Sequence, residues 1–326
     1  MRILVTGGAG FIGTHLSRRL VADGHAVTVI DNEFNGRREN VPAGATFIFA
    51  DVTKPQDIEP IFAGGFDAVC HLAGQVSIIR SFDDPVVDLR VNVEGTLNVL
   101  QMCLRHAVPR LVYASSMTAY GDTRVVPTPE TEPCRPDSYY GITKHAAERY
   151  VHSTVARPDL KQAFEAISLR MFSVYGPGQA LDNPYQGVLG IFMGKLLRGE
   201  TITIFGDGEQ TRDFVYIADI VDGWVKALTH MGESRIFNLG SGRSLSIKDL
   251  AAQAIAAYGG DPGVPRLAYA PARPGEQRTV QADITRARTD LGWHPATPFD
   301  VGLAETMRQA RIVFAAERAA AAVKTT

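Results

Sequence analysis

Cysteine is scarce in this sequence, and its few copies show no ordered spacing. Cys70, Cys103 and Cys134 are the whole set among 326 residues, and no two of them form a C-x-x-C pair. An odd, scattered set excludes a disulfide framework and is typical of a reducing compartment, so we expect a cytoplasmic protein. The eight histidines contain no H-x-x-x-H pair, and His71 ends an apolar strand. We therefore expect no metal site and a structural role for His71.

The sequence also lacks long apolar runs and an excess of charge of either sign. No apolar run reaches the roughly 18 residues that a membrane-spanning helix needs. The first predicted strand begins at residue 2, which leaves no room for a signal peptide, so no membrane association is expected. The 33 basic and 35 acidic residues are mixed along the chain and give a net charge of −2. We therefore expect no nucleic-acid partner.

A glycine-rich loop follows the first predicted strand. Residues 2–6 (RILVT) form a short apolar run, residues 7–13 read GGAGFIG, and residues 14–22 have helical spacing. Gly8, Gly10 and Gly13 fit G-x-G-x-x-G, and Gly7, Gly10 and Gly13 fit the looser G-x-x-G-x-x-G. Because glycine has no side chain, backbone N–H groups can approach a pyrophosphate, and the start of the following helix favours its charge. The strand-to-helix context favours dinucleotide binding over a glycine turn in some other βαβ fold.

An acidic residue ends the second predicted strand. Asp31 follows residues 26–30 and lies 18 residues beyond Gly13, where a carboxylate reaches the hydroxyl groups of a ribose. The carboxylate repels a 2′-phosphate, so we predict NAD rather than NADP as the cofactor. Arg37 and Arg38 could receive such a phosphate, but they lie well beyond the strand and are expected to be surface residues.

Predicted strands and helices alternate through the first 170 residues. Strands are predicted at residues 46–50, 66–71, 110–114 and 164–169, and long helices at residues 91–106 and 138–155. Alternation with continuously apolar strands predicts an α/β fold, in which helices cover both faces of a parallel sheet.

Glycine and proline become frequent beyond residue 170, which predicts a smaller and looser second lobe. They punctuate positions 176–178, 183–184, 261–263 and 273–275. Residues 236–239 (IFNL) still have the pattern of a sheet strand, so the second lobe is predicted to be discontinuous. We predict a first domain over residues 1–171, which also receives the strand at 236–239, and a second domain mainly over residues 172–326.

A tyrosine and a lysine lie four residues apart on the predicted helix at residues 138–155. Residues i and i+4 share one helix face, so Tyr140 and Lys144 can meet, whereas Tyr139 lies on another face. A lysine charge about 4 Å away contributes roughly 4 kcal/mol at an effective dielectric of about 20, enough to lower a tyrosine pKa by about 3 units. Tyr140 is therefore predicted to act as a general acid or base near neutral pH. Alone, Y-x-x-x-K is a weak signal, because most such pairs lie on a helix surface.

Hydroxyl side chains follow the predicted strand at residues 110–114. Ser115, Ser116 and Thr118 come directly after it, and ligands of open α/β sheets bind beyond the carboxyl ends of the strands. These hydroxyl groups could hydrogen-bond a substrate oxygen, although a serine-rich turn that caps a strand explains them equally well. The glycine loop, this cluster and Tyr140 with Lys144 all belong to strand ends or adjacent helices of one sheet, which favours a single active site.

The chain resembles the extended short-chain dehydrogenase/reductase family, and in particular its nucleotide-sugar epimerases. The resembling segments are residues 6–13 (TGGAGFIG), 31–32 (DN), 51–52 (DV), 71–73 (HLA), 92–96 (NVEGT), 115–116 (SS), 140–144 (YGITK), 169–177 (LRMFSVYGP) and 211–215 (TRDFV). They run through nearly the whole length of the chain. The resemblance implies a Rossmann doubly wound sheet with tightly held NAD, a smaller C-terminal substrate lobe, a nucleotide-sugar substrate carrying UDP or dTDP, and a homodimer.

The resemblance also implies roles for individual residues, with Ser116, Tyr140 and Lys144 as the catalytic triad. The implied cofactor-binding residues are Gly7, Gly10, Phe11, Ile12, Gly13, Asp31, Asn32, Asp51, Val52, Leu72, Ala73, Asn92, Tyr140 and Lys144. The implied substrate-binding residues are Ser116, Thr118, Ser173, Arg212 and Arg273. The two arginines would hold the nucleotide diphosphate through paired hydrogen bonds. Asn92 would orient Lys144, although a helix-start cap explains it equally well.

The activity that the resemblance implies is inversion of C4 of a nucleotide-linked hexose, most simply between UDP-glucose and UDP-galactose, through a transient 4-keto sugar. Met117 and Thr118 stand where family dehydratases carry an Asp-Glu pair, which disfavours dehydration. Ser173 replaces an asparagine that commonly touches substrate phosphate, and Gly178 replaces an arginine in several relatives, which weakens the case for a uronic-acid substrate.

Three other activities stay open at this point. Two keep the site and change the outcome, namely an NDP-sugar 4-ketoreductase and a UDP-glucuronate epimerase or decarboxylase. The third is a non-catalytic NAD-sensing protein, since a fold alone never fixes a function. Ser77, Arg80 and Tyr185 are further candidates for sugar contacts, although core or surface roles are expected for each.

Overall fold

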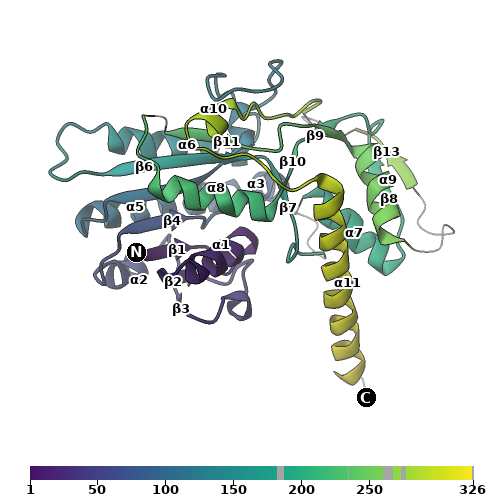
Figure 1. Ribbon diagram of the computed structural model, residues 1–326, viewed down its shortest axis with the longest axis horizontal. Coiled ribbons are helices and arrows are strands. Elements are labelled where there is room, and N and C mark those ends of the chain that lie inside the picture. The colour runs from purple at the N-terminus through teal and green to yellow at the C-terminus, as the bar shows by residue number, and fades with distance from the viewer. Residues whose placement is uncertain (182–186, 234, 260–266, 273–276, 325–326) are drawn as a thin grey trace.

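The main sheet of the protein is parallel and doubly wound (Figure 1). The structure, a computed structural model, describes residues 1–181, 187–233, 235–259, 267–272 and 277–324. Seven strands lie in the order β11-β6-β5-β4-β1-β2-β3, and each neighbouring pair is parallel. The strands are β1 (Arg2–Thr6), β2 (Ala26–Asp31), β3 (Ala45–Phe49), β4 (Ala68–His71), β5 (Arg110–Ser116), β6 (Glu165–Met171) and β11 (Ile236–Leu239). The strand order reverses beside β1, which confirms the predicted Rossmann α/β fold and places the expected ligand edge at the carboxyl ends of β1 and β4.

Helices cover both faces of this sheet. Alternate residues of a strand face opposite sides, and Val5 of β1 packs in one core cluster with Trp224, whereas Leu4 packs in another with Ile58 and Ala147. The first face carries α1 (Phe11–Ala22) and α8 (Ile217–Thr229), and the second carries α2 (Pro55–Phe62), α5 (Gly95–Arg105) and α6 (Tyr139–Val155). Shorter elements are the 3-10 helices η1 (Arg38–Asn40) and η3 (Met117–Tyr120) and the α-helices α3 (Ile78–Asp83) and α10 (Thr285–Thr289).

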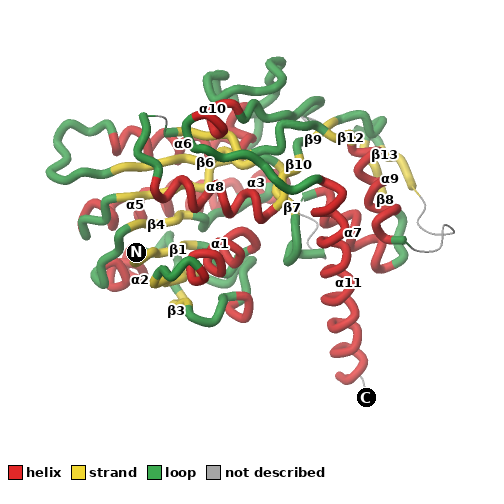
Figure 2. The backbone as a smooth tube through the Cα atoms, in the orientation of Figure 1, coloured by secondary structure: helices red, strands yellow, loops and turns green. Residues whose placement is uncertain are grey.

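The second half of the chain builds a separate core from short strands and three longer helices (Figure 2). Its elements are β7 (Ser173–Tyr175), α7 (Val188–Arg198), β8 (Ile202–Phe205), β9 (Thr211–Arg212), β10 (Phe214–Tyr216), β12 (Leu245–Ser246), α9 (Ile247–Tyr258), β13 (Leu267–Ala270) and α11 (Phe299–Lys324). The strands pair two by two, as β7 with β10, β8 with β13, and β9 with β12. Phe192 of α7, Leu250 of α9 and Met307 of α11 meet in the core of this lobe. None of the helices among the described residues is both long enough and apolar enough to cross a bilayer.

Residues from the second half also fill the core of the first. β11 pairs with β6, with Phe237 opposite Leu169. α8 packs against α1 on one face of the sheet, and Trp224 and Trp293 are fully buried in the same cluster. The chain therefore returns to the main sheet well after residue 171. The domain boundary at that residue stays a prediction.

The helix predicted at residues 91–106 starts earlier and is not uniform. It begins with α4 (Pro85–Leu89), passes through a π-helical turn, η2 (Arg90–Glu94), and continues as α5. The Asp84 side chain accepts a hydrogen bond from the Val87 N–H at 3.1 Å, and Pro85 occupies the first turn, a start signal that apolar spacing does not show. Asn92 lies inside η2, so its interpretation as a helix-start cap is wrong. A π turn inside a helix is frequent at functional sites.

Candidate active site

The glycine loop joins β1 to α1 in a tight turn. Gly7 has φ +67°, and a Cβ atom there would lie 2.7 Å from the backbone nitrogen of Ala73. A Cβ atom on Gly13 would lie 2.3 Å from the carbonyl oxygen of Gly7, and the Gly10 N–H donates to that same oxygen at 3.2 Å. Gly7, Gly10 and Gly13 therefore pack on one another, which is the arrangement of the looser of the two glycine motifs.

The first turn of α1 is suited to a phosphate group. Gly10 stands at the N-cap without a side-chain hydrogen bond, and the first turn contains no acidic residue. The backbone N–H groups that open a helix lack partners within it, so those of Phe11 and Ile12 are available to an anion. A cradle that cannot accept a Cβ, followed by this helix start, fits the pyrophosphate of a dinucleotide.

The residues predicted to hold the adenosine lie together beyond β2 and β3. Asn32 donates from Nδ2 to a carboxylate oxygen of Asp51 at 3.1 Å, and the Val52 carbonyl accepts a hydrogen bond from Asn98 at 2.9 Å. Asp31 is 8% exposed and accepts the Ala9 N–H of the glycine loop at 3.1 Å. Burial raises the pKa of Asp31, but a carboxylate accepts several hydrogen bonds, so it can still receive a ribose hydroxyl group.

The end of β4 is fixed to β1. The Leu72 N–H donates to the Thr6 carbonyl at 3.1 Å, and the Ala73 N–H donates to Thr6 Oγ1 at 3.2 Å. The imidazole of His71 hydrogen-bonds Thr6 Oγ1 at 2.7 Å and Thr96 Oγ1 at 3.0 Å. Burial lowers the pKa of His71 to about 3, so the ring is neutral and holds the two strands and α5 together. The predicted structural role of His71 is confirmed.

Three hydroxyl groups meet where β5 ends and α6 begins. Ser116 lies near enough to the Tyr140 hydroxyl to act to lower its pKa, and Thr118 donates from Oγ1 to Ser116 Oγ at 2.9 Å. Each of these side chains is at most 9% exposed. Ser138 caps α6 by accepting the Gly141 N–H at 3.1 Å, which fixes the direction of the turn that carries Tyr140. The structure therefore brings the predicted acid/base and its hydroxyl partner into contact.

The prediction that Lys144 lowers the pKa of Tyr140 is wrong for the protein chain by itself. Burial raises the pKa of Tyr140 to about 12, and the nearby Ser116 hydroxyl offsets only part of that rise. Burial also lowers the pKa of Lys144 to about 7. Desolvation penalises the charged form of both groups. The Coulomb energy of two charges near the protein surface therefore overstates how far Lys144 lowers the pKa of Tyr140.

A buried polar network that the sequence analysis did not predict lies beside Lys144. Asp88 of α4 is fully buried, and its carboxylate accepts hydrogen bonds from Thr143 Oγ1 (2.6 Å), Gln75 Nε2 (2.7 Å) and Asn92 Nδ2 (3.1 Å). A Cβ atom on the neighbouring Gly74 would lie 2.9 Å from Asn92 Oδ1 and 3.8 Å from Lys144 Nζ. An acidic residue four positions before Asn92 was the only sequence signal for this network.

The substrate side of the site begins directly after β6. Met171 at the end of β6 lies opposite Ser116 of β5. Ser173, two residues on, donates its N–H to the Asp213 carbonyl at 2.9 Å, which places Arg212 close by. The structure therefore brings Ser173 and Arg212 to the edge of the sheet that carries Ser116.

Arg212 reaches across to a distant part of the chain. Its Nη1 donates to the Gln277 carbonyl at 2.9 Å. Arg273 and Tyr185, both predicted to touch substrate, lie outside the described residues.

The other two candidate sugar contacts lie on α3 and face other partners. Ser77 caps α3 by accepting the Arg80 N–H at 3.1 Å. The guanidinium of Arg80 lies 4.1 Å from the centre of the Phe34 ring, in the loop after β2. These contacts explain both residues without a sugar.

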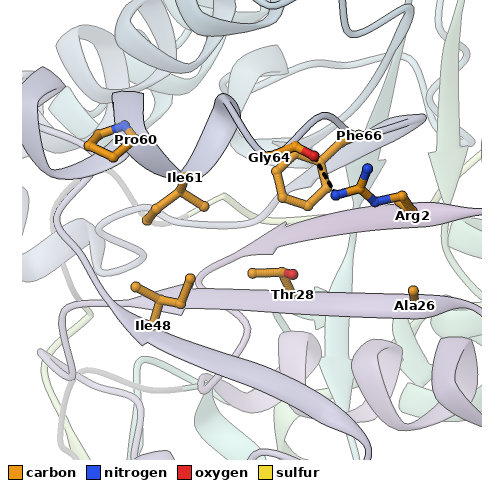
Figure 3. Close-up of a pocket in the computed structure, with 8 residues that line it drawn as sticks. All are labelled: Arg2, Ala26, Thr28, Ile48, Pro60, Ile61, Gly64 and Phe66. Carbon is orange, nitrogen blue, oxygen red and sulfur yellow. Dashed lines mark hydrogen bonds between the residues drawn. The ribbon is translucent and has the colours of Figure 1, made fainter.

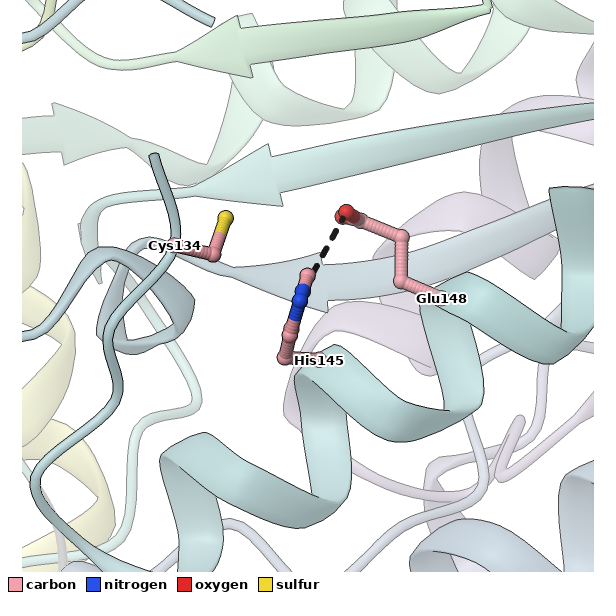
Figure 4. Close-up of side chains that lie close together, drawn as sticks. All are labelled: Cys134, His145 and Glu148. Carbon is pink, nitrogen blue, oxygen red and sulfur yellow. Dashed lines mark ion pairs between the residues drawn. The ribbon is translucent and has the colours of Figure 1, made fainter. Parts of the chain in front are cut away.

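Two other features lie outside the site. The atoms of Cys134, His145 and Glu148 that could bind a metal ion lie close to one another (Figure 4). Glu148, however, accepts hydrogen bonds from Arg170 at 2.5 and 3.0 Å, and the positive charge of that guanidinium disfavours a metal cation beside it.

A hollow of about 280 Å³ opens between α2 and the face of β1–β3 (Figure 3). Arg2 lines it at the amino end of β1, whereas ligands of such sheets bind at the carboxyl ends.

Comparisons with known proteins agree with this geometry. The chain is 38% identical to the UDP-glucose 4-epimerase of Mycolicibacterium smegmatis over 315 residues, which cover 94% of this chain and 97% of that protein. It is 34% identical to UDP-glucuronic acid decarboxylase 1 of Xenopus tropicalis over 95% of this chain and 72% of that protein. The structure of a UDP-glucose 4-epimerase from Thermotoga maritima with UDP-glucose matches at a TM-score of 0.91 and 36% identity, covering 96% of this chain and 99% of that one.

A family model matches the chain over residues 3–240, which include β1, the glycine loop, Ser116, Tyr140, Lys144 and β11. The family is described as the NAD dependent epimerase/dehydratase family. This match covers most of the chain, and the similar relatives cover nearly all of it. The chain therefore belongs to the NAD dependent epimerase/dehydratase family, a group of extended short-chain dehydrogenases/reductases.

Proposed function

We propose that this protein is an NAD-dependent isomerase that inverts C4 of a nucleotide-linked hexose, with UDP-glucose and UDP-galactose as the simplest pair. The observation that carries the proposal is the buried Tyr140 hydroxyl beside Ser116, at the same sheet edge as the glycine loop. Relatives named as UDP-glucose 4-epimerases resemble the chain over nearly its whole length, which supports this choice.

The three catalytic residues have separate roles in this proposal. Tyr140 removes the proton of the sugar 4-hydroxyl group and returns it after inversion. Ser116 hydrogen-bonds the same oxygen and relays the proton to Tyr140. Lys144 holds the nicotinamide ribose. NAD, when bound, supplies the hydride acceptor for C4 and a positively charged ring beside the phenol.

Inversion itself requires the substrate lobe. Once C4 is a flat ketone, presenting its other face to the same position inverts the centre. Ser173 and Arg212 are proposed to hold the diphosphate while the sugar turns. The guanidinium of Arg212 suits this role, because such groups bind phosphate oxygens through paired hydrogen bonds. The same role for Arg273 stays a prediction.

The cofactor side is proposed to hold NAD as the sequence predicts. Gly7, Gly10 and Gly13 make room for the pyrophosphate, and the helix start at Phe11 supplies N–H donors. Asp31 faces the ribose, and its carboxylate disfavours a 2′-phosphate.

We also propose a homodimer. Apolar side chains on α3, α4 and α6 are roughly half exposed, and the three helices pack against one another. They are Phe82, Val86, Leu89, Tyr139, Ile142 and Tyr150. An apolar surface of this kind on neighbouring helices suits a second copy of the same chain. Light scattering of the wild type and of Ile142→Glu tests the homodimer, and a wild-type monomer would contradict it.

The three free cysteines suit a reducing compartment, so we propose that the protein is located in the cytoplasm.

One experiment tests the function directly. The purified protein is incubated with NAD and a panel of UDP-, dTDP-, GDP- and CDP-sugars, and the products are separated. We expect the C4 epimer of one nucleotide-sugar with no net change in reduced nicotinamide, because the cofactor is regenerated in each cycle. The panel also identifies the nucleotide.

The same experiment separates the other candidates. Similarity to a UDP-glucuronic acid decarboxylase favours a second candidate, oxidative decarboxylation, which would release carbon dioxide from a UDP-uronate. A ketoreductase would consume reduced nicotinamide. NAD binding without turnover of any sugar would contradict the proposal and support a sensing role.

A further inference from the structure

Two carboxylates influence the Lys144 ammonium, and their own surroundings differ. Glu148 lies one turn further along α6 and is ion-paired with Arg170, with Nη2 to Oε1 at 2.5 Å and Nε to Oε2 at 3.0 Å. Ser115 donates a third hydrogen bond to Glu148 at 2.6 Å. The Arg170 guanidinium therefore compensates the charge of Glu148, and Asp88 acts more strongly than Glu148 on the pKa of Lys144.

Asp88 has no such partner among the described ion pairs. Its three donors, the side chains of Gln75, Asn92 and Thr143, are all neutral. The carboxylate is fully buried, and a buried charge requires compensation. Burial raises the pKa of Asp88, and the charge of Lys144 acts to lower it. Lys144 Nζ and Asn92 Oδ1 both lie beside Gly74, so the ammonium is next to the side chain that donates to Asp88.

The same carboxylate links three elements around the site. Gln75 belongs to the loop after β4, Asn92 to the π turn η2, and Thr143 to α6, where it lies between Tyr140 and Lys144. Thr143 Oγ1 also contacts the Tyr140 carbonyl at 3.1 Å. Moving Asp88 would therefore release the loop from the helix that carries both reactive side chains.

We propose that Asp88 is a positioning residue, which provides the counter-charge of Lys144 and fastens the loop after β4 to α6. The catalytic part of this inference rests on the proposed function, and the electrostatic part does not.

Within the described ranges, three further titratable groups face Lys144, and all three are neutral at pH 7. Burial lowers the pKa of His71 on β4 to about 3 and raises the pKa of Tyr113 on β5, whose ring centre lies 4.5 Å from Lys144 Nζ. Burial also raises the pKa of Tyr140 on α6. The negative charge of Asp88 acts to raise the pKa values of both Lys144 and Tyr140. Removing it should lower both.

The test is Asp88→Asn, which keeps the shape of the side chain and removes its charge. The acid limb and the alkaline limb of the pH–rate profile should both move to lower pH by about one unit, the size of shift that a nearby charge produces. The matched control is Asp219→Asn, because that carboxylate is also buried and accepts the N–H groups of Ala296 and Thr297 away from the site. It should leave both limbs in place.

A second readout needs neither cofactor nor substrate. The pKa of Lys144 is lowered from 10.5 to about 7 in the folded protein, so between these values the unfolded chain binds more protons and stability rises with pH. In Asp88→Asn this rise should begin at a lower pH, as urea unfolding of the protein alone would show. This measurement separates the role of Asp88 from the proposed epimerase function, because the shift in stability is expected even if the protein turns over no nucleotide-sugar.

Two outcomes would overturn the inference. One is an Asp88→Asn protein whose stability rises from the same pH as the wild type, whatever its rate. The other concerns Asp88→Glu, which keeps the charge and serves if Asp88→Asn does not fold. Its limbs should stay at the wild-type pH even where the rate falls, and displaced limbs would contradict the role of the charge.

Discussion

The two sides of the proposed active site are held in place by different means. On the cofactor side, Ser116, Tyr140 and Lys144 are nearly fully buried and stand on the ends of long parallel strands or on α6. On the substrate side, Ser173 and Arg212 are half-buried and stand on strands of three and two residues. The reactive groups are therefore fixed by the main sheet, whereas the groups proposed to hold the sugar nucleotide belong to short strands in the other half of the chain.

This difference suits a reaction in which the sugar turns and the reactive groups do not. Catalytic groups need a fixed geometry, because small displacements lower the rate strongly. A substrate that must present both faces needs a lobe that holds its diphosphate without fixing its ring. Substitutions on the two sides should therefore have different kinetic signatures, the first in kcat and the second in KM.

The largest effect is expected for Tyr140→Phe, which removes the proposed acid/base and keeps the ring. We expect kcat to fall at least about 10²-fold, the size of a positioned proton-transfer contribution, with NAD affinity nearly unchanged. Steady-state kinetics with calorimetric NAD titration measures both. The matched control is Tyr139→Phe, because Tyr139 is 45% exposed on a neighbouring face of α6. A near-normal rate for Tyr140→Phe would exclude it as the acid/base.

The contrast between the two sides also explains what could be predicted from the sequence. Local patterns are sufficient on the cofactor side, since strand ends of a parallel sheet meet at one edge. The glycine loop, the hydroxyl cluster at Ser115 and Ser116 and the Tyr140–Lys144 pair could therefore be assigned to one site from the sequence alone. On the substrate side, Arg212 reaches Gln277 across 65 residues, a contact that no local pattern reports.

Burial was the physical quantity that the sequence could not supply on the cofactor side. The Tyr140–Lys144 spacing is visible in the sequence, but the desolvation that raises one pKa and lowers the other depends on the packing around both. The same holds for Asp88. An aspartate in a helical stretch is usually exposed, and only the fold shows that this one is buried.

The second largest effect should follow from Gly13→Ala in the glycine loop. The new methyl group would meet the Gly7 carbonyl at 2.3 Å and the Gly8 Cα at 2.6 Å, so the loop backbone must move. Overpacking of this kind costs about 1–3 kcal/mol, and we expect at least a roughly tenfold loss of NAD affinity by calorimetric titration. Gly187→Ala in the other lobe is the control, because within the described part of the chain its methyl group would meet only the amide end of Gln179, at 3.2 Å. Equal effects of the two variants would remove the distinction between the sides.

Arg212→Lys should act on the substrate side alone. It keeps the charge but loses the paired hydrogen bonds that a guanidinium makes to phosphate oxygens. We expect KM for the nucleotide-sugar to rise roughly five- to tenfold, about 1–1.4 kcal/mol or the net contribution of one ordinary hydrogen bond, with kcat little changed. Thermal unfolding controls for loss of the Gln277 contact. A fall in kcat at constant KM would place Arg212 with the reactive groups instead.

The smallest effect is expected for Arg80→Ala, where the sequence could not decide between a sugar contact and a surface role. The Arg80 guanidinium lies over Phe34, which is 51% exposed, so the contact is worth about 0.5–1 kcal/mol of stability. Urea unfolding should show that loss in Arg80→Ala and again in Phe34→Leu, while the double variant loses less than the sum because the two residues share one interaction. KM for the nucleotide-sugar should stay at its wild-type value. A severalfold rise in KM would instead assign Arg80 to the sugar, and the substrate side would then extend onto α3, which packs against α4 and α6.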